Sequence, residues 1–268
     1  MGVGAGGGVV GLATTKGNRV MHPIAFQIGE YQIRYAGLLY LVAIIVAWVY
    51  TWRVAKRRQW DSDVVLPGIA AVVAAAYLGA RLHGSMRDWD RFAAEPLREL
   101  VRSGDLSFFG GLALGSIAMV AFLRWVKLPV GAAADEMSAI APVLYAMFRL
   151  GCFLNGDDYG RPTSLPWGMS FPDGAPPTVE RVHPVQLYEM ALMVPIWLAL
   201  RSRRRLALPD GALTFELCVL MGIERFVVEF LRPGFSEADY LATSQWFALT
   251  LFAVGATGRF RLKFGARR

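Results

Sequence analysis

The sequence has few cysteines, few histidines and little charge. It contains two cysteines and three histidines among 268 residues, and Asp, Glu, Lys and Arg together make up 18% of the chain. Both cysteines, Cys152 and Cys218, lie inside apolar runs, so they predict no disulfide framework. No zinc-type spacing and no glycine-rich phosphate loop can be read in the sequence. We therefore expect neither a metal nor a cofactor.

Apolar residues take the place of the missing charge. The chain is 55% hydrophobic and its mean hydropathy is +0.39, which is too apolar for an ordinary soluble domain. The formal net charge is +7, but the basic residues fall in short clusters between apolar runs. That distribution is typical of membrane topology and of contact with anionic lipids. We therefore expect an integral membrane protein with membrane lipids, and no nucleic acid, as partners.

Seven apolar runs have the length of membrane spans, which is roughly 17–25 residues. They cover residues 35–52, 64–83, 107–125, 137–154, 184–200, 212–231 and 241–258. The second and third runs are rich in Gly and Ala, which allow neighbouring helices to approach closely. The fold class that we expect is an all-α integral membrane protein with seven transmembrane helices.

Basic residues indicate the orientation of the spans. Clusters of Arg and Lys follow the first, third, fifth and seventh runs, whereas the alternate loops carry fewer basic and more acidic residues. Because cytoplasmic loops are enriched in Lys and Arg, the C-terminus is expected in the cytoplasm and the N-terminus outside.

The segments outside the runs complete the expected organisation. Residues 1–20 are predicted to be a flexible Gly-rich tail, residues 21–258 the membrane domain, and residues 259–268 a basic cytoplasmic tail. Within the domain, residues 84–106 alternate apolar and charged side chains and predict an external amphipathic segment. Residues 155–183, rich in Gly, Pro and Asp, predict a small external cap.

Seven ionisable residues interrupt the runs or their ends, where each would cost a few kcal/mol or more if unpaired. They are Arg81, Arg149, Glu189, Glu216, Glu224, Arg225 and Glu229. The orientation above places Arg81, Arg149, Arg225 and Arg232 in the external half. Arginines at one depth repel each other unless an anion lies between them, and Arg binds phosphate well. This pattern predicts a pocket for a phospholipid phosphate near the external face.

Other interpretations of these residues remain open. Arg225 and Glu229 are four residues apart and share one helix face, so they could simply pair with each other. Alternatively, Glu229 could orient an arginine or handle a proton. His183 precedes Pro184 at the start of a run and could serve as an interfacial cap. Cys152 could be a small packing residue, because no activator of its thiol is evident.

The chain resembles the prolipoprotein diacylglyceryl transferases, which are bacterial inner-membrane enzymes. The resemblance covers about residues 23–245 and rests on the segments PIAFQIGEYQIRYAGLLY, SFFGGLALG, RLGCFLNGDDYGRPTSLPWGMSFP, HPVQLYE and RFVVEFLR. It implies a multi-pass protein of the plasma membrane that moves the diacylglyceryl group of phosphatidylglycerol to the lipobox cysteine of a prolipoprotein signal peptide and releases glycerol phosphate. We expect the protein to act as a monomer.

The resemblance also implies roles for individual residues. The expected catalytic residues are Arg149, Arg225, Glu229 and His183. The expected substrate-binding residues are Arg149, Asn155, Asp157, Gly160, Tyr35 and Arg225. The arginines would neutralise the donor phosphate and stabilise its charge as it leaves.

The sequence departs from the family pattern at positions that would face the acceptor. Phe109 stands where the family has a histidine that is a candidate base, Cys152 replaces the first motif asparagine, and Ala36 replaces a tyrosine for which Tyr35 could substitute. Loss of a general base costs about 10²–10⁴-fold in rate. Three hypotheses therefore remain at this point: the transferase itself, a paralogue with another acceptor, and a non-catalytic phospholipid-binding protein.

Overall fold

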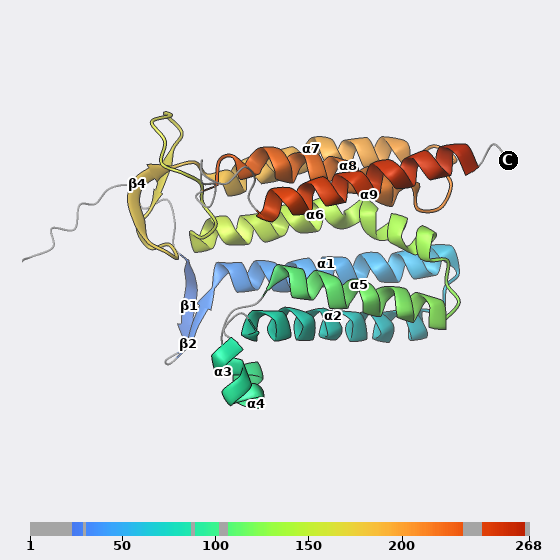
Figure 1. Ribbon diagram of the computed structural model, residues 1–268, viewed down its shortest axis with the longest axis horizontal. Coiled ribbons are helices and arrows are strands. Elements are labelled where there is room, and N and C mark those ends of the chain that lie inside the picture. The colour runs from blue at the N-terminus through green and yellow to red at the C-terminus, as the bar shows by residue number, and fades with distance from the viewer. Residues whose placement is uncertain (1–22, 29–30, 87–88, 102–106, 233–242, 266–268) are drawn as a thin grey trace, which may run out of the picture.

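The computed structural model describes residues 23–28, 31–86, 89–101, 107–232 and 243–265. Within these ranges seven helices are 18 residues or longer, and they lie roughly side by side (Figure 1). They are α1 (Tyr35–Arg58), α2 (Ser62–Ser85), α5 (Phe108–Trp125), α6 (Val130–Asn155), α7 (Val185–Arg203), α8 (Ala212–Glu229) and α9 (Thr243–Gly265). Each predicted apolar run overlaps one of these helices.

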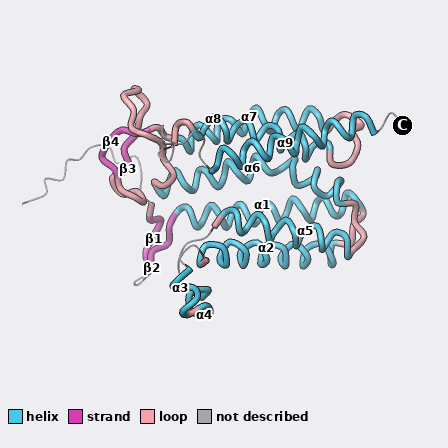
Figure 2. The backbone as a smooth tube through the Cα atoms, in the orientation of Figure 1, coloured by secondary structure: helices cyan, strands magenta, loops and turns pink. Residues whose placement is uncertain are grey.

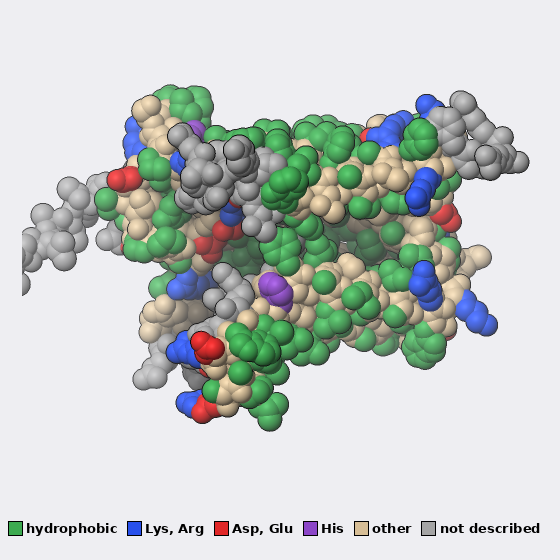
Figure 3. Space-filling view, viewed as in Figure 1, with side chains coloured by type: hydrophobic (Ala, Val, Ile, Leu, Met, Phe, Trp, Pro, Cys, Tyr) green, Lys and Arg blue, Asp and Glu red, His purple; other side chains and the backbone are tan. Residues whose placement is uncertain are grey.

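Three of the helices are long and apolar enough to cross a membrane by length and composition. These are α1, α2 and α6, and α5 contains a shorter apolar stretch. Large apolar side chains face outward, including Ile44 on α1 (56% exposed), Ile117 on α5 (65%) and Trp246 on α9 (60%). Figure 3 shows hydrophobic side chains over the sides of the bundle and Lys and Arg gathered toward its two ends. An apolar surface of this kind fits contact with lipid rather than water.

Small residues allow α2 and α5 to pack closely. A Cβ added at Gly79 on α2 would lie 2.4 Å from the carbonyl oxygen of Gly110 on α5, and a Cβ at Gly110 would lie 2.2 Å from the carbonyl oxygen of Gly79. The two backbones therefore touch directly, as small residues permit in membrane helices. The α8 and α9 helices approach each other in a similar way at Gly222 and Gly255.

Helix α6 packs against α1 on one side and α7 on the other. Near its start the buried carboxylate of Glu136 pairs with Arg57 and Arg58 of α1, at 2.6 and 2.8 Å, and with Arg204 after α7. At its other end Gly156 takes a left-handed conformation (φ 69°), which terminates the helix and turns the chain into a polar loop. The local sequence therefore ends α6 where the candidate site begins.

The all-α expectation is incomplete because two small sheets lie at one end of the bundle (Figure 2). Strands β1 (Ile24–Ile28) and β2 (Tyr31–Arg34) form one antiparallel pair, and β3 (Met169–Phe171) and β4 (Thr178–Val182) form the other. The second pair falls in the segment predicted as a cap. These strands are too short for hydropathy to reveal them.

Two further segments differ from their predicted structure. Residues 84–106 contain two short helices, α3 (Trp89–Ala94) and α4 (Pro96–Val101), because Pro96 suits a helix start rather than a helix interior. Helix α9 continues to Gly265 and so includes most of the predicted basic tail. The predicted N-terminal tail, residues 1–20, lies outside the described residues.

Candidate functional site

Arg149 lies near the end of α6 with only 4% of its side chain exposed. Its Nη2 donates to Oε1 of Glu189 at 2.7 Å, and its Nε lies against the other oxygen of that carboxylate. Its Nη1 donates to Oδ2 of Asp158 at 2.8 Å. Glu189 comes from α7 and is fully buried. A buried arginine that holds two carboxylates at once is a strongly determined position, because a charge left unpaired there would be costly.

Two further arginines join this group from α8 and the turn that follows it. Arg225 contacts Glu229 at 2.8 Å and Glu189 at 3.2 Å. Arg232 contacts the second oxygen of Asp158 at 2.9 Å and lies 3.6 Å from Glu189. The structure thus brings Arg149 of α6 together with Arg225 and Glu229 of α8, and each of these residues was singled out from the sequence. We call Arg149, Arg225, Arg232, Asp158, Glu189 and Glu229 the ion cluster.

In the ion cluster, carboxylates of the protein itself lie between the arginines, and the predicted phosphate pocket stays a prediction. Three guanidinium groups face three carboxylates, so the formal charges cancel within the protein. The pairing of Arg225 with Glu229 follows the four-residue spacing that allowed this alternative. Glu224 is a further buried acid that interacts with Glu189 and Arg225, and neither of its carboxylate oxygens has a hydrogen-bond partner among the described residues. Any phosphate must therefore compete with carboxylates for the arginines.

Arg81 lies apart from the ion cluster, contrary to the depth argument that grouped it with the other arginines. Its Nε and Nη2 donate to the backbone carbonyl oxygens of Leu100 and Glu99, at 2.9 and 3.0 Å. It therefore satisfies carbonyls at the end of α4. The charge of Arg81 in an apolar run correctly indicated that it has a partner. Hydropathy could not show whether this partner is a carboxylate or the carbonyl groups at the end of a helix.

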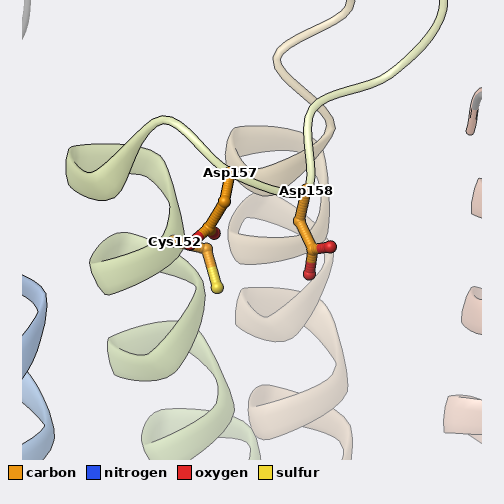
Figure 4. A group of neighbouring side chains, drawn as sticks. All are labelled: Cys152, Asp157 and Asp158. Atoms are coloured by element: carbon orange, nitrogen blue, oxygen red, sulfur yellow. The ribbon is translucent and has the colours of Figure 1, made fainter. Parts of the chain in front are cut away.

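The loop after α6 places two acidic residues beside the arginines. Figure 4 shows Asp157 beside Cys152 of α6 and Asp158 further along the loop. Burial raises the pKa of Asp157, against the opposing effect of its hydrogen bond with Asn155. Burial also acts to raise the pKa of Asp158, but Arg232 and Arg149 outweigh it and hold that pKa below its usual range. Asp158 is therefore more firmly ionised than Asp157.

The thiol of Cys152 and the carboxylates of Asp157 and Asp158 have ligand atoms within 4.8 Å of one another, close enough to suggest a metal site. However, both oxygens of Asp158 bind arginines, and Asp157 accepts a hydrogen bond from the Asn155 amide. The positive charges of the two arginines that contact Asp158 would repel a metal cation bound to the same carboxylate. The donor set therefore fits ion pairing better than metal binding.

A cavity of about 560 Å³ opens on the ion cluster. Residues of the loop after α6, of the β3–β4 hairpin and of the end of α8 line it: Asp157, Asp158, Tyr159, Ala175, Pro176, Arg225, Glu229 and Arg232. The cavity thus reaches Arg225 and Arg232 directly, whereas Arg149 lies behind them and is not part of its lining. Its volume falls in the range of about 300–1,000 Å³ usual for small-molecule sites.

The remaining predicted binding residues shape this loop. The side-chain oxygen of Asn155 accepts a hydrogen bond from Arg34 at 2.7 Å, which ties the end of α6 to β2. Gly160 donates its N–H to the carbonyl oxygen of His183 at 2.8 Å. A Cβ at Gly160 would lie 2.5 Å from the carbonyl oxygen of Leu231. Gly160 therefore allows the loop to pass between the start of α7 and the turn after α8, where a side chain would meet both.

His183 and Tyr35 lie outside the lining of the cavity. Nδ1 of His183 is 3.3 Å from the hydroxyl of Tyr188, and that hydroxyl accepts a hydrogen bond from Trp167 at 2.8 Å. Tyr35 begins α1 with 42% of its surface exposed. His183, Tyr188 and Trp167 thus form a row of polar contacts. The roles of His183 and Tyr35 stay predictions.

The three positions that depart from the family pattern have ordinary packing environments. Phe109 lies edge-on against Phe247 of α9, with ring centroids 5.4 Å apart. Cys152 is buried, and its sulfur lies 3.8 Å from Arg149 Nη1 and 3.9 Å from the Tyr40 hydroxyl. Ala36 is buried at the start of α1. Cys152 thus packs against the ion cluster, as the packing interpretation of this residue predicts.

Two members of the ion cluster, Glu189 and Asp158, have no role that was predicted from the sequence. Glu189 was visible as an acid within an apolar run, and HPVQLYE was part of the resemblance, but its partner could not be inferred. Asp158 gave no signal, because it is one of several acids in a polar loop. Only the folded chain shows that these two carboxylates hold Arg149.

These features define a class: a helical membrane protein with a buried arginine–carboxylate site at one end of its bundle. The profile of the prolipoprotein diacylglyceryl transferase family matches residues 23–261. The chain belongs to this family.

Individual relatives agree with this assignment. The chain is 34% identical over 244 residues to a protein of Geobacter sulfurreducens, covering 88% of this chain and 93% of the relative. It is 36% identical over 231 residues to a protein of Solidesulfovibrio magneticus, covering 82% and 84%. It is 32% identical over 258 residues to a protein of Agrobacterium fabrum, covering 90% and 89%. Each relative is named phosphatidylglycerol–prolipoprotein diacylglyceryl transferase.

Proposed function

We propose that this protein transfers the diacylglyceryl group of phosphatidylglycerol to the cysteine thiol of a prolipoprotein. The thiol sulfur forms a thioether with the glycerol carbon of the donor, the bond between that carbon and the phosphate oxygen breaks, and glycerol phosphate leaves with the electron pair. The thiol proton passes to a base. The observation that carries the proposal is the set of three arginines, two of them lining the cavity, in a chain that belongs to this family.

The proposed setting is the bacterial inner membrane. We propose seven spans, formed by α1, α2, α5, α6, α7, α8 and α9, with the N-terminus outside and the C-terminus in the cytoplasm. This orientation is supported by the distribution of Lys and Arg between the runs. The ion cluster then lies toward the external leaflet, where a prolipoprotein would present its cysteine. We further propose that a monomer suffices, since one chain supplies every residue of the cluster.

Arg149 and Arg225 are proposed to bind the donor phosphate and to stabilise the charge that develops on it as the carbon–oxygen bond breaks. Guanidinium groups suit this role because they donate two parallel hydrogen bonds to phosphate oxygens. Glu229 would hold Arg225 in position through its 2.8 Å contact. Asn155, Asp157 and Gly160 would shape the loop that borders the phosphate.

The proton acceptor is proposed to differ from the histidine of the family pattern, because Phe109 cannot accept a proton. His183 is the first candidate, although it lies outside the lining of the cavity. Its Nδ1 lies 3.3 Å from the Tyr188 hydroxyl, and if Nδ1 donates its hydrogen there, Nε2 is left to accept the thiol proton. The carboxylate of Glu229 is the second candidate, because it lines the cavity.

Purified protein in phosphatidylglycerol-containing nanodiscs tests the proposal directly. With a lipobox peptide it should transfer labelled diacylglycerol to the cysteine and release glycerol phosphate. Arg149→Ala and Arg225→Ala should each lower the rate about 10²–10³-fold, the effect of removing one charge-stabilising donor. Arg98→Ala is the matched control, because Arg98 pairs with Glu95 on the surface of α4 and its side chain is 76% exposed.

Each contrary result has a specific meaning. Equal activity in Arg149→Ala, Arg225→Ala and Arg98→Ala would contradict the proposed phosphate site. Release of glycerol phosphate that requires a different added acceptor, without lipidated peptide, would indicate a transferase with another acceptor. Phosphatidylglycerol binding without turnover of any acceptor would indicate a lipid-binding protein.

A further inference from the structure

We propose that Asp158 and the donor phosphate occupy the same arginine donors in turn, so that phosphatidylglycerol binds by displacing the Asp158 carboxylate from Arg149 and Arg232. The inference rests on the proposed function, because it takes the ion cluster as the phosphate site. It assigns Asp158 as a residue that sets the affinity and selectivity of this site.

The geometry of Asp158 resembles that of a bound phosphodiester. One carboxylate oxygen lies 2.8 Å from Nη1 of Arg149 and the other 2.9 Å from Nη2 of Arg232. Two oxygens of a single anionic group thus bridge two guanidiniums. The two unesterified oxygens of a phosphodiester carry the same charge and can make the same bridge.

Exposure identifies which carboxylate can leave. The side chains of Glu189 and Glu229 are 0% and 7% exposed, whereas that of Asp158 is 44% exposed. A buried carboxylate that loses its partner pays a large desolvation cost, but a half-exposed one regains water. Asp158 is therefore the member of the ion cluster that a ligand can displace at the lowest cost.

Charge balance favours exchange over simple addition. The three arginines and three carboxylates of the ion cluster already cancel formally. A phosphodiester added to the intact cluster would bring a net negative charge into a largely buried site. If Asp158 turns into solvent, three arginines face two carboxylates and one phosphate, and the balance is kept.

The position of Asp158 in the chain allows this exchange. It lies in the loop beyond the end of α6, so its side chain can rotate without moving a helix. Its backbone is left-handed (φ 60°), a conformation that Asp and Asn tolerate better than most residues. The carboxylate also lines the cavity from which a ligand would approach.

The exchange explains how the site could select its donor. A lipid that carries no phosphate offers no anion to replace Asp158, so the arginines keep their internal partner. A headgroup phosphate replaces it on both guanidiniums. Asp158 thus acts as a competitor that only an anion with two adjacent oxygens can displace.

The test is Asp158→Asn, which removes the competing charge and keeps the size and the left-handed backbone of the residue. In micelles of an uncharged sugar detergent, which carries no phosphate, the variant should bind added phosphatidylglycerol about tenfold more tightly, the change expected from losing one charge-assisted contact. Asp173→Asn is the matched control, because Asp173 is an exposed acid on the neighbouring hairpin. Titration with soluble glycerol phosphate, and separately with inorganic phosphate, shows whether the headgroup chemistry alone is recognised.

Unchanged or weaker phosphatidylglycerol binding by Asp158→Asn, relative to Asp173→Asn, would overturn the inference. If Asp158→Asn unfolds, Asp158→Ser provides the same charge removal with a smaller side chain and the same expected tightening. Failure of the proposed function is distinguishable, because binding would then also survive Arg149→Ala. Binding lost in Arg149→Ala but unaltered in Asp158→Asn would refute only the exchange.

Discussion

Replacing Glu189 by Gln tests whether the ion cluster is held together by one carboxylate. Glu189 is fully buried and contacts Arg149 with both oxygens. It also lies 3.2 Å from Arg225 and 3.6 Å from Arg232. Glutamine keeps the shape of the side chain and removes its charge, so three buried or half-buried guanidiniums would be left facing two carboxylates.

The magnitude follows from the burial of these groups. Removing one partner of a buried ion pair costs about 3–5 kcal/mol, because the remaining charge is left uncompensated. For a chain of this size each kcal/mol corresponds to about 2–4 °C in the melting temperature. We therefore expect Glu189→Gln to melt about 10 °C below the unmodified protein in detergent, as followed by tryptophan fluorescence.

Glu216→Gln is the matched control on α8. Glu216 also contacts two arginines, Arg259 at 2.8 Å and Arg203 at 3.4 Å, but their side chains are 38% and 40% exposed. Exposed pairs contribute about 0–1 kcal/mol, so the control should lose little. Equal melting temperatures for the two variants would refute the electrostatic account of the ion cluster.

A ligand experiment separates charge from packing. Glu189→Gln leaves an excess positive charge, so glycerol phosphate should raise its melting temperature more than that of the unmodified protein. Stabilisation that is the same in both proteins would contradict the presence of an unbalanced positive charge in the variant.

Two other predictions concern the loop after α6. Gly160→Ala should destabilise the protein by about 1–3 kcal/mol, because the added methyl would lie 2.5 Å from a backbone oxygen; Gly37→Ala, where no atom lies within 4 Å, should be neutral in the same melting assay. Asp157→Asn should match or exceed the stability of the unmodified protein at pH 7. The reason is that burial raises the pKa of Asp157, so its ionisation favours the unfolded state once the pH passes the unfolded value of about 3.9. The advantage should vanish below about pH 3.9, and a variant less stable at pH 7 would contradict this sign.

The helices could be predicted because a bilayer requires long apolar runs, and each run is visible in the sequence. The sheets could not, since β3 has three residues and its pairing with β4 is set by the fold. Within the site, Arg149, Arg225 and Glu229 were detectable as charges in apolar surroundings.

The partners of these charged residues could not be detected in the sequence. An arginine in an apolar run requires a partner, but the partner depends on which helices are neighbours, and hydropathy does not encode lateral order. Arg81 illustrates this limit, because its partners are the carbonyls of a short surface helix. Asp158 shows the same limit for an acid in a loop. It can be recognised as part of the site only once the fold places Arg232, in the turn after α8, beside it.

The two ionic anchors of α6 have a consequence for the surrounding bilayer. Glu136 and Arg149 are separated by about 20 Å along the axis, at about 1.5 Å per residue, and each is fixed to neighbouring segments by ion pairs. The hydrocarbon core of a typical bilayer is about 30 Å thick. Both side chains are buried and face the interior of the bundle, so they fix the depth of the charges and leave the lipid-facing surface of α6 apolar. With α6 crossing the membrane as proposed, two anchors about 20 Å apart cannot both reach the headgroup layers of a core about 30 Å thick, so at least one group of buried charges lies at the depth of the lipid tails.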